Sequence, residues 1–328
     1  MSDAIPLLSV RDLHVHFKLA SDSPWPWASP RVLKAVSGVS FDIYSGQTLG
    51  VVGESGCGKS TLARALLNLI PATAGSIAWQ GQEMRGAAPA AWPDIRQSVQ
   101  MIFQDPLASL NPRMTIGRII AEPLRTHFPR MTGTDVMQKV RAMMQKVGLT
   151  EQQINRYPHE FSGGQCQRIG IARALVLEPK LVICDEPVSA LDVSIQAQII
   201  NLLMELQSQM DLALLFIAHD LAVVKHISQR VMVMYLGRAM ELADKTAIYQ
   251  KPSHPYTQAL LSAIPLPDPR RERSKVLQLL QGELPSPMNP PSGCSFRTRC
   301  PNAQAICAQQ TPAMRALNPN TEVACLLA

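Results

Sequence analysis

Nine consecutive residues have the composition of a phosphate-binding loop. The pattern G-x-x-x-x-G-K-S is met within Gly53-Glu54-Ser55-Gly56-Cys57-Gly58-Lys59-Ser60-Thr61. Its glycines can adopt backbone angles that a Cβ atom forbids, so the loop can curl and direct its N–H groups toward an anion. Lys59 supplies a full positive charge for the β- and γ-phosphates, and the Ser60 hydroxyl is a ligand for Mg²⁺. This chemistry suits a nucleoside triphosphate.

The residues on either side of the loop supply the elements that must position it. Thr48–Val52 is short, apolar and β-branched, which predicts a buried strand, and Thr61–Leu67 has the pattern of a helix. A helix that begins near Lys59 directs its positive dipole end toward the same anion. A glycine-rich turn that merely contains a lysine is the simpler alternative, and the strand and helix disfavour it.

Three apolar segments of strand type end in polar side chains of the kind that a nucleotide site uses. The segments and their terminal residues are 99–103 with Gln104, 181–184 with Asp185 and Glu186, and 212–218 with His219. Because ligands of open parallel α/β sheets bind at the carboxyl ends of the strands, we expect these side chains to converge on the phosphate loop. The alternatives are a solvated loop start for the two acids and an ordinary hydrogen-bonded histidine for His219.

A second helix start has the features of an anion site. Ser162-Gly163-Gly164-Gln165 places Ser162 as the N-cap of a helix predicted over Gln165–Leu177, and the two glycines expose backbone N–H groups. A capped helix without a ligand is the alternative interpretation. Ser189-Ala190-Leu191-Asp192 opens the next predicted helix.

The other elements are predicted more coarsely. Strand patterns occupy residues 7–17 and 33–43, and two short strands are predicted within 75–103 around a polar, Ala/Pro-rich turn. Residues 115–160 are mostly helical by pattern, with Gly148 as a helix stop and a methionine stripe that we assign to the core.

An aromatic side chain is expected to stack on an adenine base, since every base has a π-face. Phe17 is the first candidate, although an ordinary core position is an equally good explanation for it. Trp25 and Trp27 are weaker candidates, because they lie in a Pro-rich loop at 21–30 that can fold away from the site.

Composition limits the class of protein. The chain has 328 residues, 46% of them hydrophobic and 17% charged, which predicts a folded protein with two or three subdomains. We find no apolar run long enough to span a membrane, and the first six residues have no pattern of an export signal. The net charge of +6 suits nucleic acid or an anionic membrane surface, but no dense basic cluster selects one.

Four of the seven cysteines lie together after a Pro-rich stretch at 264–293. They are Cys294, Cys300, Cys307 and Cys325, separated by 5, 6 and 17 residues. Without an export signal, disulfides are a poor explanation and a metal or iron–sulfur site is a better one. The spacing matches neither the C-x-x-C zinc pattern nor the ferredoxin pattern, so zinc, a [4Fe–4S] cluster and four unliganded thiols all stay open.

Taken together, these motifs resemble the ATP-binding subunits of ABC transporters, and the resemblance covers essentially the whole chain. The motifs occur in the family's order: the phosphate loop at 53–60, Gln104, the signature at 162–165, the strand and acids at 181–186, the segment 189–192, and His219. Residues 157–160, 254–261 and 293–301 are similar to the bacterial dipeptide/oligopeptide permease family. One departure is Cys166, at a position that is usually polar or charged, where we expect slightly altered helix packing and intact function.

The resemblance implies a fold and a division into domains. The fold is α/β, a P-loop NTPase (RecA-like) ABC ATPase core with an antiparallel β subdomain and a helical subdomain. The ATPase domain is expected over 1–245, with the helical subdomain at about 105–165, and a cysteine-containing extension over 246–328. Two such domains would pair head to tail, so that ATP lies between the phosphate loop of one and Ser162–Gln165 of the other, with Asp192 in the same site.

The resemblance also assigns roles to single residues. Mg²⁺ would be held by Ser60, Gln104 and Asp185, with Asp185 acting directly or through water. Glu186 would polarise the attacking water as general base, His219 would contact the γ-phosphate, and Gln104 would sense the γ-phosphate and the metal. The catalytic residues are therefore expected to be Glu186, His219 and Gln104, and the cofactors ATP and Mg²⁺.

The implied function is an ATPase that energises a membrane importer of dipeptides or oligopeptides, at the cytoplasmic face of the bacterial inner membrane. Its expected partners are a second ATPase subunit, more often a paralogue than a copy of itself, two transmembrane permease subunits and, through them, an extracytoplasmic solute-binding protein. In relatives of this kind the tail cysteines hold a [4Fe–4S] cluster. A soluble ABC ATPase acting on nucleic acid or ribosomes is the alternative; the single cassette without a long coiled-coil insertion disfavours it. A regulatory ATPase is a third possibility.

Overall fold

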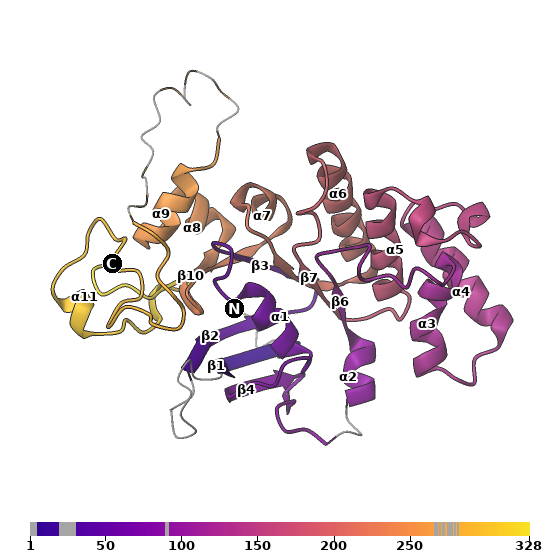
Figure 1. Ribbon diagram of the computed structural model, residues 1–328, viewed down its shortest axis with the longest axis horizontal. Helices are drawn as coiled ribbons and strands as arrows, with labels where there is room; N and C mark the ends of the chain where they lie inside the picture. The colour runs from indigo at the N-terminus through magenta and orange to yellow at the C-terminus, as the bar shows by residue number, and fades with distance from the viewer. Residues whose placement is uncertain are drawn as a thin grey trace, which may run out of the picture. The chain divides into compact units, whose positions relative to one another are not determined.

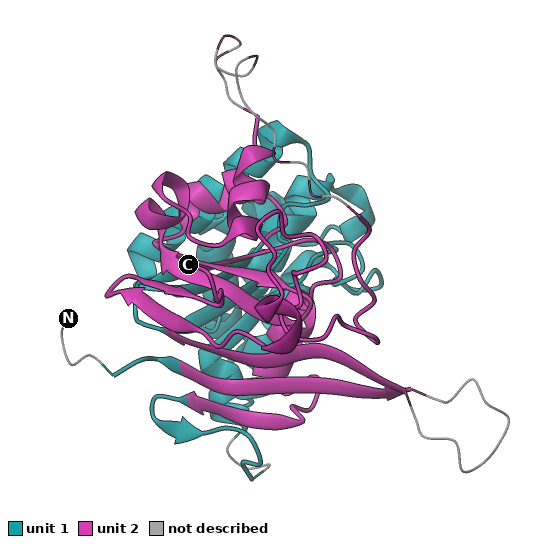
Figure 2. Ribbon diagram, turned by 90° about the vertical axis from the view of Figure 1, so that its left-hand side faces the viewer, with its two compact units in different colours: residues 1–8, 43–48, 79–217 teal, residues 9–42, 49–78, 218–328 magenta. Residues whose placement is uncertain are grey.

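The computed structural model describes residues 5–19, 31–88, 92–265, 268, 270, 273, 278, 280 and 282–328. These residues form two compact units, coloured separately in Figure 2. Unit 1 comprises Met1–Leu8, Ile43–Thr48 and Trp79–Ile217, and unit 2 comprises Ser9–Asp42, Leu49–Ala78 and Ala218–Ala328. Trp25 and Trp27, the weaker candidates for adenine stacking, lie outside the described residues.

The centre of unit 1 is a set of three parallel strands. They are β6 (Val99–Ile102), β7 (Leu181–Asp185) and β8 (Ala213–Ile217). Ile102 is paired with Cys184, and Asp185 is paired with Ile217. Every residue of β7 and β8 is buried, as expected for the continuous apolar runs of parallel strands that are covered on both faces. The residues that follow these three strands therefore lie at the same edge of the sheet.

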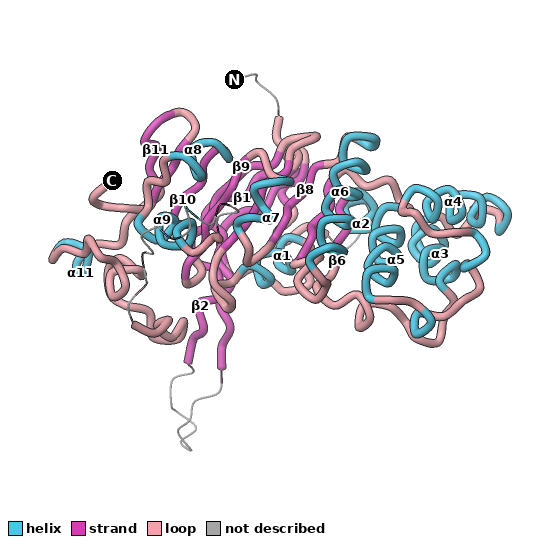
Figure 3. Tube along the Cα trace, turned by 90° about the horizontal axis from the view of Figure 1, so that it is seen from above, coloured by secondary structure: helices cyan, strands magenta, loops and turns pink. Residues whose placement is uncertain are grey.

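Helices form the other part of unit 1. Three of them pack against one another in Figures 1 and 3: α3 (Ile116–His127), α4 (Gly133–Lys146) and α5 (Gly163–Leu175). Met143 and Met144 of α4 are buried, which confirms that the methionine stripe belongs to the core. The predicted helix stop is also confirmed, because Gly148 has a φ of 74° directly after the C-cap of α4.

The remaining elements of unit 1 include two that the sequence patterns did not predict. These two are β5 (Gln82–Glu83) and α2 (Trp92–Ser98). The other elements are η2 (Glu151–Gln153), η3 (Pro158–Glu160) and α6 (Val193–Met210). Helix α2 lies where an Ala/Pro-rich turn was expected. Pro93 is in its first turn, where a missing N–H costs no helical hydrogen bond. Composition alone therefore misassigned this segment.

Unit 2 contains two groups of strands. Strands β1 (Leu8–Leu19), β2 (Arg31–Ile43) and β4 (Ala74–Trp79) are neighbours in the order β2-β1-β4. The buried positions of β1 change from even to odd numbers after Asp12, whose φ of 46° inserts an irregularity into the strand. The second group carries the phosphate loop: β3 (Thr48–Val52) is parallel to β9 (Arg230–Tyr235), which is antiparallel to β10 (Arg238–Asp244).

The carboxyl-terminal residues extend this second group of strands. Strand β12 (Thr321–Val323) pairs antiparallel with β10, with Glu241 opposite Val323, and β11 (Arg315–Asn318) pairs with β12. Unit 2 also contains α1 (Lys59–Leu66), α7 (Leu221–Ile227), α8 (Lys245–Gln250), α9 (Pro255–Ser262) and α11 (Ile306–Gln309). The tail thus belongs to the same unit as the phosphate loop, and a domain boundary after residue 245 stays a prediction.

The start of the tail is fixed by a buried carboxylate. Glu241 of β10 is fully buried and accepts hydrogen bonds from the backbone N–H groups of Ser253 at 2.7 Å and His254 at 3.0 Å. His254 in turn is the N-cap of α9, because its Nδ1 accepts the Tyr256 N–H at 3.0 Å. Burial lowers the pKa of His254 to about 4, so the ring is neutral at pH 7 and can accept that hydrogen bond.

Candidate functional site

The phosphate loop connects β3 to α1 and packs closely against two other backbone segments. Gly53 and Gly58 have φ angles of 156° and 103°, which side chains rarely adopt. A Cβ atom at Gly53 would lie 2.2 Å from the Met234 carbonyl oxygen, and one at Gly58 would lie 2.1 Å from the Ala35 carbonyl oxygen. Both glycines are therefore required by the close approach of other backbone segments as well as by their own conformation.

Lys59 lies at the centre of this loop. Its side chain is 4% exposed, and Nζ donates hydrogen bonds to the Gly53 carbonyl at 2.8 Å and the Glu54 carbonyl at 3.2 Å. These oxygens stabilise an ammonium group that has been taken out of water. The adjacent Cys57 is buried, and burial raises the pKa of its thiol, so it stays neutral beside the cation. The loop thus presents one concentrated positive charge.

The start of α1 favours an anion. Gly58 is its N-cap and supplies no side-chain hydrogen bond, and in the described chain no acidic side chain lies in the first turn. The N-terminal N–H groups of a helix need partners, and its dipole favours negative charge there. Ser60 is half-buried in that first turn, while Ser55 and Gly56 of the loop are exposed. The sequence pattern and the local structure therefore agree on an anion site.

Two of the expected catalytic residues meet in unit 1. Gln104 follows β6, and its Nε2 donates a hydrogen bond to Glu186 Oε2 at 3.1 Å. Glu186 follows β7 with a φ of 45°, and its N–H donates to the Ile217 carbonyl at 3.0 Å. A left-handed conformation costs a non-glycine residue about 1–2 kcal/mol, so the fold holds Glu186 in place against a local preference. Asp185, one residue earlier, is buried at the strand end.

The signature segment is a capped helix start that faces solvent. Ser162 and Gly163 are exposed, and the Ser162 and Gln165 side chains cap one another's backbone N–H groups. Helix α5 begins at Gly163, two residues before the predicted start, because the cap fixes the chain at Ser162. Gly164 is closely packed, since a Cβ there would lie 2.6 Å from Ile195 Cγ2.

Cys166, the departure in this segment, is fully buried and its Sγ donates to the Pro158 carbonyl at 3.5 Å. Burial raises the pKa of its thiol, so Cys166 is a neutral packing residue.

The other predicted residues are placed as follows. His219 is exposed two residues after β8, next to Asp220, which caps α7 by accepting the Ala222 N–H at 2.7 Å. Phe17 is half-buried on β1, and its role in adenine stacking stays a prediction. Asp192 is the exposed N-cap of α6. Lys59, Ser60, Thr61 and His219 belong to unit 2; Gln104, Asp185, Glu186 and the signature belong to unit 1.

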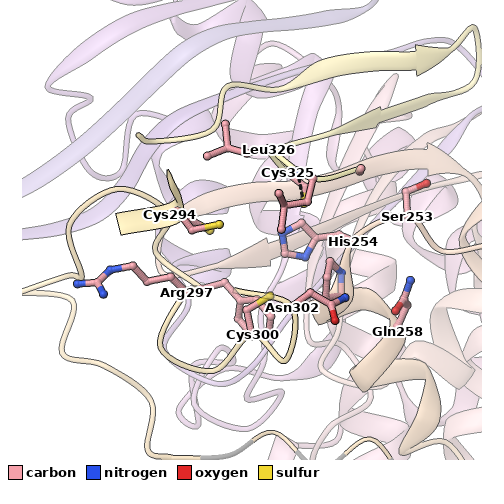
Figure 4. Close-up of a pocket in the computed structure, with 14 residues that line it drawn as sticks. Ser253, His254, Gln258, Cys294, Arg297, Cys300, Asn302, Cys325 and Leu326 are labelled. Carbon is pink, nitrogen blue, oxygen red and sulfur yellow. Dashed lines mark hydrogen bonds between the residues drawn. The ribbon is translucent and has the colours of Figure 1, made fainter. Parts of the chain in front are cut away.

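The four cysteines of the tail line one pocket of unit 2, shown in Figure 4. Its cavity volume is about 90 Å³, and all four side chains are free thiols. Burial raises the pKa of Cys294, and the other three cysteines raise it further. Among the residues that the structure describes, no three His, Cys, Asp or Glu side chains are grouped as a metal ion requires. The predicted iron–sulfur cluster thus gains no support from this geometry.

Sequence reasoning missed the residues that join the tail to the phosphate loop. The Glu54 N–H donates to Tyr256 Oη at 3.1 Å, and the Glu54 carboxylate accepts from Arg299 Nη1 at 2.8 and 3.0 Å. Tyr256 and Arg299 lie within segments 254–261 and 293–301, which were notable only for their family resemblance. Nothing in the local pattern of either segment indicates a contact with residue 54.

Comparisons with known proteins indicate the family. Residues 36–189 match the family model "ABC transporter", and residues 240–307 match "Oligopeptide/dipeptide transporter, C-terminal region". The oligopeptide transport ATP-binding protein OppF of Escherichia coli is 63% identical over 94% of this chain and 92% of its own length. OppF of Salmonella typhimurium is 65% identical over the same shares, and OppF of Haemophilus influenzae is 62% identical over 98% and 96%.

Solved structures agree on the fold. The ATP-binding cassette MJ0796, in a dimeric post-hydrolysis state bound to ADP and Pi, matches with a TM-score of 0.64 at 23% identity, over 73% of this chain and 98% of that one. CbiO1 from Clostridium perfringens matches with a TM-score of 0.63 at 23% identity, over 75% and 91%.

Among the described residues, no helix combines the length and the apolar character that crossing a membrane requires. The predicted fold, a P-loop ABC ATPase, is confirmed by the solved cassettes, and the predicted family by the curated relatives. With 62% to 65% identity to three OppF proteins over 92% to 96% of their lengths, this chain belongs to the family of ATP-binding subunits of ABC-type oligopeptide transporters.

Proposed function

We propose that this protein binds ATP at Gly53–Thr61 and hydrolyses it to energise the import of peptides through a membrane permease. The observation that carries the proposal is the placement of Lys59: a buried ammonium group, held by two loop carbonyls, at an uncapped helix N-terminus. Such a site favours a phosphate-type anion. The curated relatives, all named for oligopeptide transport, support peptides as the transported class.

Each residue of the site has a role in phosphoryl transfer. The loop N–H groups and Lys59 bind the phosphates, and Ser60, Gln104 and Asp185 offer the oxygen ligands that Mg²⁺ prefers. The bound Mg²⁺ would neutralise charge on the phosphates. Glu186 accepts the proton of the water that attacks the γ-phosphorus, and the bond from that phosphorus to the bridging oxygen of ADP breaks. His219 contacts the γ-phosphate.

Gln104 orients the general base. Its amide donates to the Glu186 carboxylate at 3.1 Å, while the backbone of Glu186 is fixed by Ile217. A positioned base and a positioned metal ligand act by holding the reactants in line rather than by forming covalent bonds. Gln104, which contacts the metal and the γ-phosphate, thereby links them to Glu186, which activates the water.

The signature segment completes the site of a second subunit. Ser162 and Gly163 present the N-terminus of α5 to solvent, which suits a phosphate bound to another chain. The second subunit is a paralogue rather than a copy of this chain. The two ATPase subunits would dock on two transmembrane permease subunits at the cytoplasmic face of the bacterial inner membrane, and an extracytoplasmic binding protein would deliver the peptide.

We further propose that Cys294, Cys300, Cys307 and Cys325 bind a [4Fe–4S] cluster. The chemistry of the donor set supports this proposal, because such clusters are bound by four cysteine thiolates and these four cysteines are free thiols. These four residues would hold the group, and no step of ATP hydrolysis depends on it.

The first prediction concerns the partners. Affinity purification of the full-length protein from detergent-solubilised bacterial membranes should recover two permease subunits and a second ATPase subunit, identified by mass spectrometry. The matched control is the same purification from the soluble fraction. Recovery of ribosomes or nucleic acid in place of permease subunits would contradict the proposed function.

The second prediction tests the general base. Glu186→Gln should keep the hydrogen bond from Gln104 and bind ATP with unchanged affinity, yet lower the turnover of the assembled transporter about 10²- to 10⁴-fold, since it removes the proton acceptor. The control is Glu178→Gln, which alters only an exposed ion pair with Lys139. Near-normal hydrolysis by Glu186→Gln would remove Glu186 from this role.

The third prediction tests the shared site. Gly163→Ala adds a methyl group that lies 3.4 Å from Leu191, an ordinary contact, so the chain should fold and bind ATP normally. Turnover in the paired ATPase should fall at least about tenfold, because the methyl group obstructs the phosphate of the partner's nucleotide. Gly133→Ala is the control: Gly133 also opens a helix, and a Cβ there meets no described atom within 4 Å. Equal turnover in both variants would count against a shared site.

The fourth prediction tests the cluster. Anaerobically purified protein should contain iron and acid-labile sulfide, and Cys294→Ser should lose both. Cys166→Ser, which changes a buried cysteine of unit 1 outside the pocket, should retain them. Colourless protein with zinc, or with no metal, would eliminate the cluster.

A further inference from the structure

Glu54 occupies an unspecified position of the pattern G-x-x-x-x-G-K-S, and all three of its polar groups form hydrogen bonds. Its carbonyl accepts from Lys59 Nζ at 3.2 Å, and its N–H donates to Tyr256 Oη at 3.1 Å. Its carboxylate accepts two hydrogen bonds from Arg299 Nη1, at 2.8 and 3.0 Å. Two of these three partners come from the tail, 202 and 245 residues away in sequence. The conformation of this loop residue is therefore set largely by the carboxyl-terminal part of the chain.

Arg299 is delivered to Glu54 by a tightly turned segment. The backbone N–H of Arg297 donates to the Cys294 carbonyl at 3.1 Å, and that of Arg299 donates to the Phe296 carbonyl at 3.0 Å. Phe296 is fully buried, with its ring 5.3 Å from those of both Tyr235 and Tyr256. Tyr235 ends β9, the strand parallel to β3, which leads into the phosphate loop. The aromatic contacts thus anchor the turn beside the loop.

The surroundings of Arg299 strengthen its ion pair. The guanidinium group lies over the Tyr235 ring, 5.9 Å from its centroid. The side chains of Arg299 and Glu54 are 10% and 25% exposed, so the pair is shielded from solvent far more than an ordinary surface salt bridge. Removing one partner of such a pair leaves the other charge partly buried and without compensation.

The charge of Glu54 is unfavourable for a phosphate loop by itself. A carboxylate on the loop repels the phosphates of ATP, and Coulomb interactions over several ångströms persist where solvent is partly excluded. Arg299 cancels this charge and at the same time holds the side chain against the tail. The same contact therefore has an electrostatic effect on the nucleotide and a mechanical effect on the loop.

We propose that Arg299 is a positioning residue of the nucleotide site: it neutralises Glu54, and through this ion pair the carboxyl-terminal extension sets the affinity of the phosphate loop for ATP. The inference rests on the proposed binding of ATP at Gly53–Thr61. It assigns to the extension an action on the ATPase site of its own chain, exerted through the phosphate loop.

The experiment is a double-mutant cycle on the full-length chain, read out as the dissociation constant of MgATP by titration calorimetry. Arg299→Met should weaken binding on the order of tenfold, because Glu54 then faces the phosphates without compensation. Glu54→Gln should bind more tightly than the natural chain, because Arg299 then adds an uncompensated positive charge beside the phosphates. The double variant Glu54→Gln/Arg299→Met should return to within about twofold of the natural chain, and the weakening by Arg299→Met should shrink at high salt.

Two further variants separate charge from folding. Arg299→Lys keeps the charge and should give an intermediate affinity. Arg297→Met removes an arginine from the same turn whose hydrogen bonds go to Ser292, and its MgATP affinity should equal that of the natural chain. Thermal unfolding of each variant identifies any that fail to fold, and the Glu54→Gln and Arg299→Lys results test the proposal even if Arg299→Met is unstable.

Three outcomes would overturn the inference. Unchanged affinity in Arg299→Met would exclude the effect on the nucleotide. Weakened affinity that Glu54→Gln does not restore would make Arg299 a purely structural residue. If the natural chain itself binds no MgATP, the proposed ATP site fails and the inference fails with it. The titration of the natural chain distinguishes this outcome from the other two.

Discussion

The burial of the Lys59 ammonium group is the constraint on which the arrangement of the phosphate loop depends. A cation that is only 4% exposed requires acceptors, and the carbonyls of Gly53 and Glu54 supply them. These carbonyls can face inward only because glycines allow the loop to curl against the Met234 and Ala35 backbones. Glu54 is the point at which this network meets the tail, since its N–H and its carboxylate are bound by residues beyond 250.

Hydrogen bonds also hold Glu186, the proposed general base, in place. Glu186 follows a fully buried strand, and its N–H continues the ladder to β8 by one hydrogen bond, to Ile217. The left-handed φ angle turns the chain immediately afterward, and the Ser189 hydroxyl donates to the Glu186 carbonyl at 3.1 Å. Local strain is thus offset by hydrogen bonds on both sides of the residue. The carboxylate is left to interact with the amide of Gln104, from the neighbouring strand.

The sequence predicted those features that depend on short-range patterns. The glycine spacing of the loop, the Ser162 cap and the strands that end at Gln104 and Glu186 all follow from residue types within a few positions of one another. Helix α2 was missed because alanine and proline are shared by turns and first helical turns. The Arg299–Glu54 pair was missed because a contact over 245 residues leaves no mark on local periodicity. The predicted stacking of Phe17 on adenine depends on the position of a bound ligand, which residue types do not encode. The predicted domain boundary after residue 245 depends on how the domains pack, which residue types do not encode either.

The pairing of β12 with β10 has a bearing on how the protein is made. Unit 2 is assembled from three separate stretches of sequence, and its last strand ends at Val323, five residues before the final residue of the chain. Domains form during synthesis as their residues leave the ribosome, so the long central stretch of unit 1 can collapse while the tail is still untranslated. Unit 2, including the aromatic anchor beside the phosphate loop, can reach its final form only after β12 has left the ribosome. A newborn chain therefore completes the surroundings of its nucleotide loop later than the central stretch of unit 1.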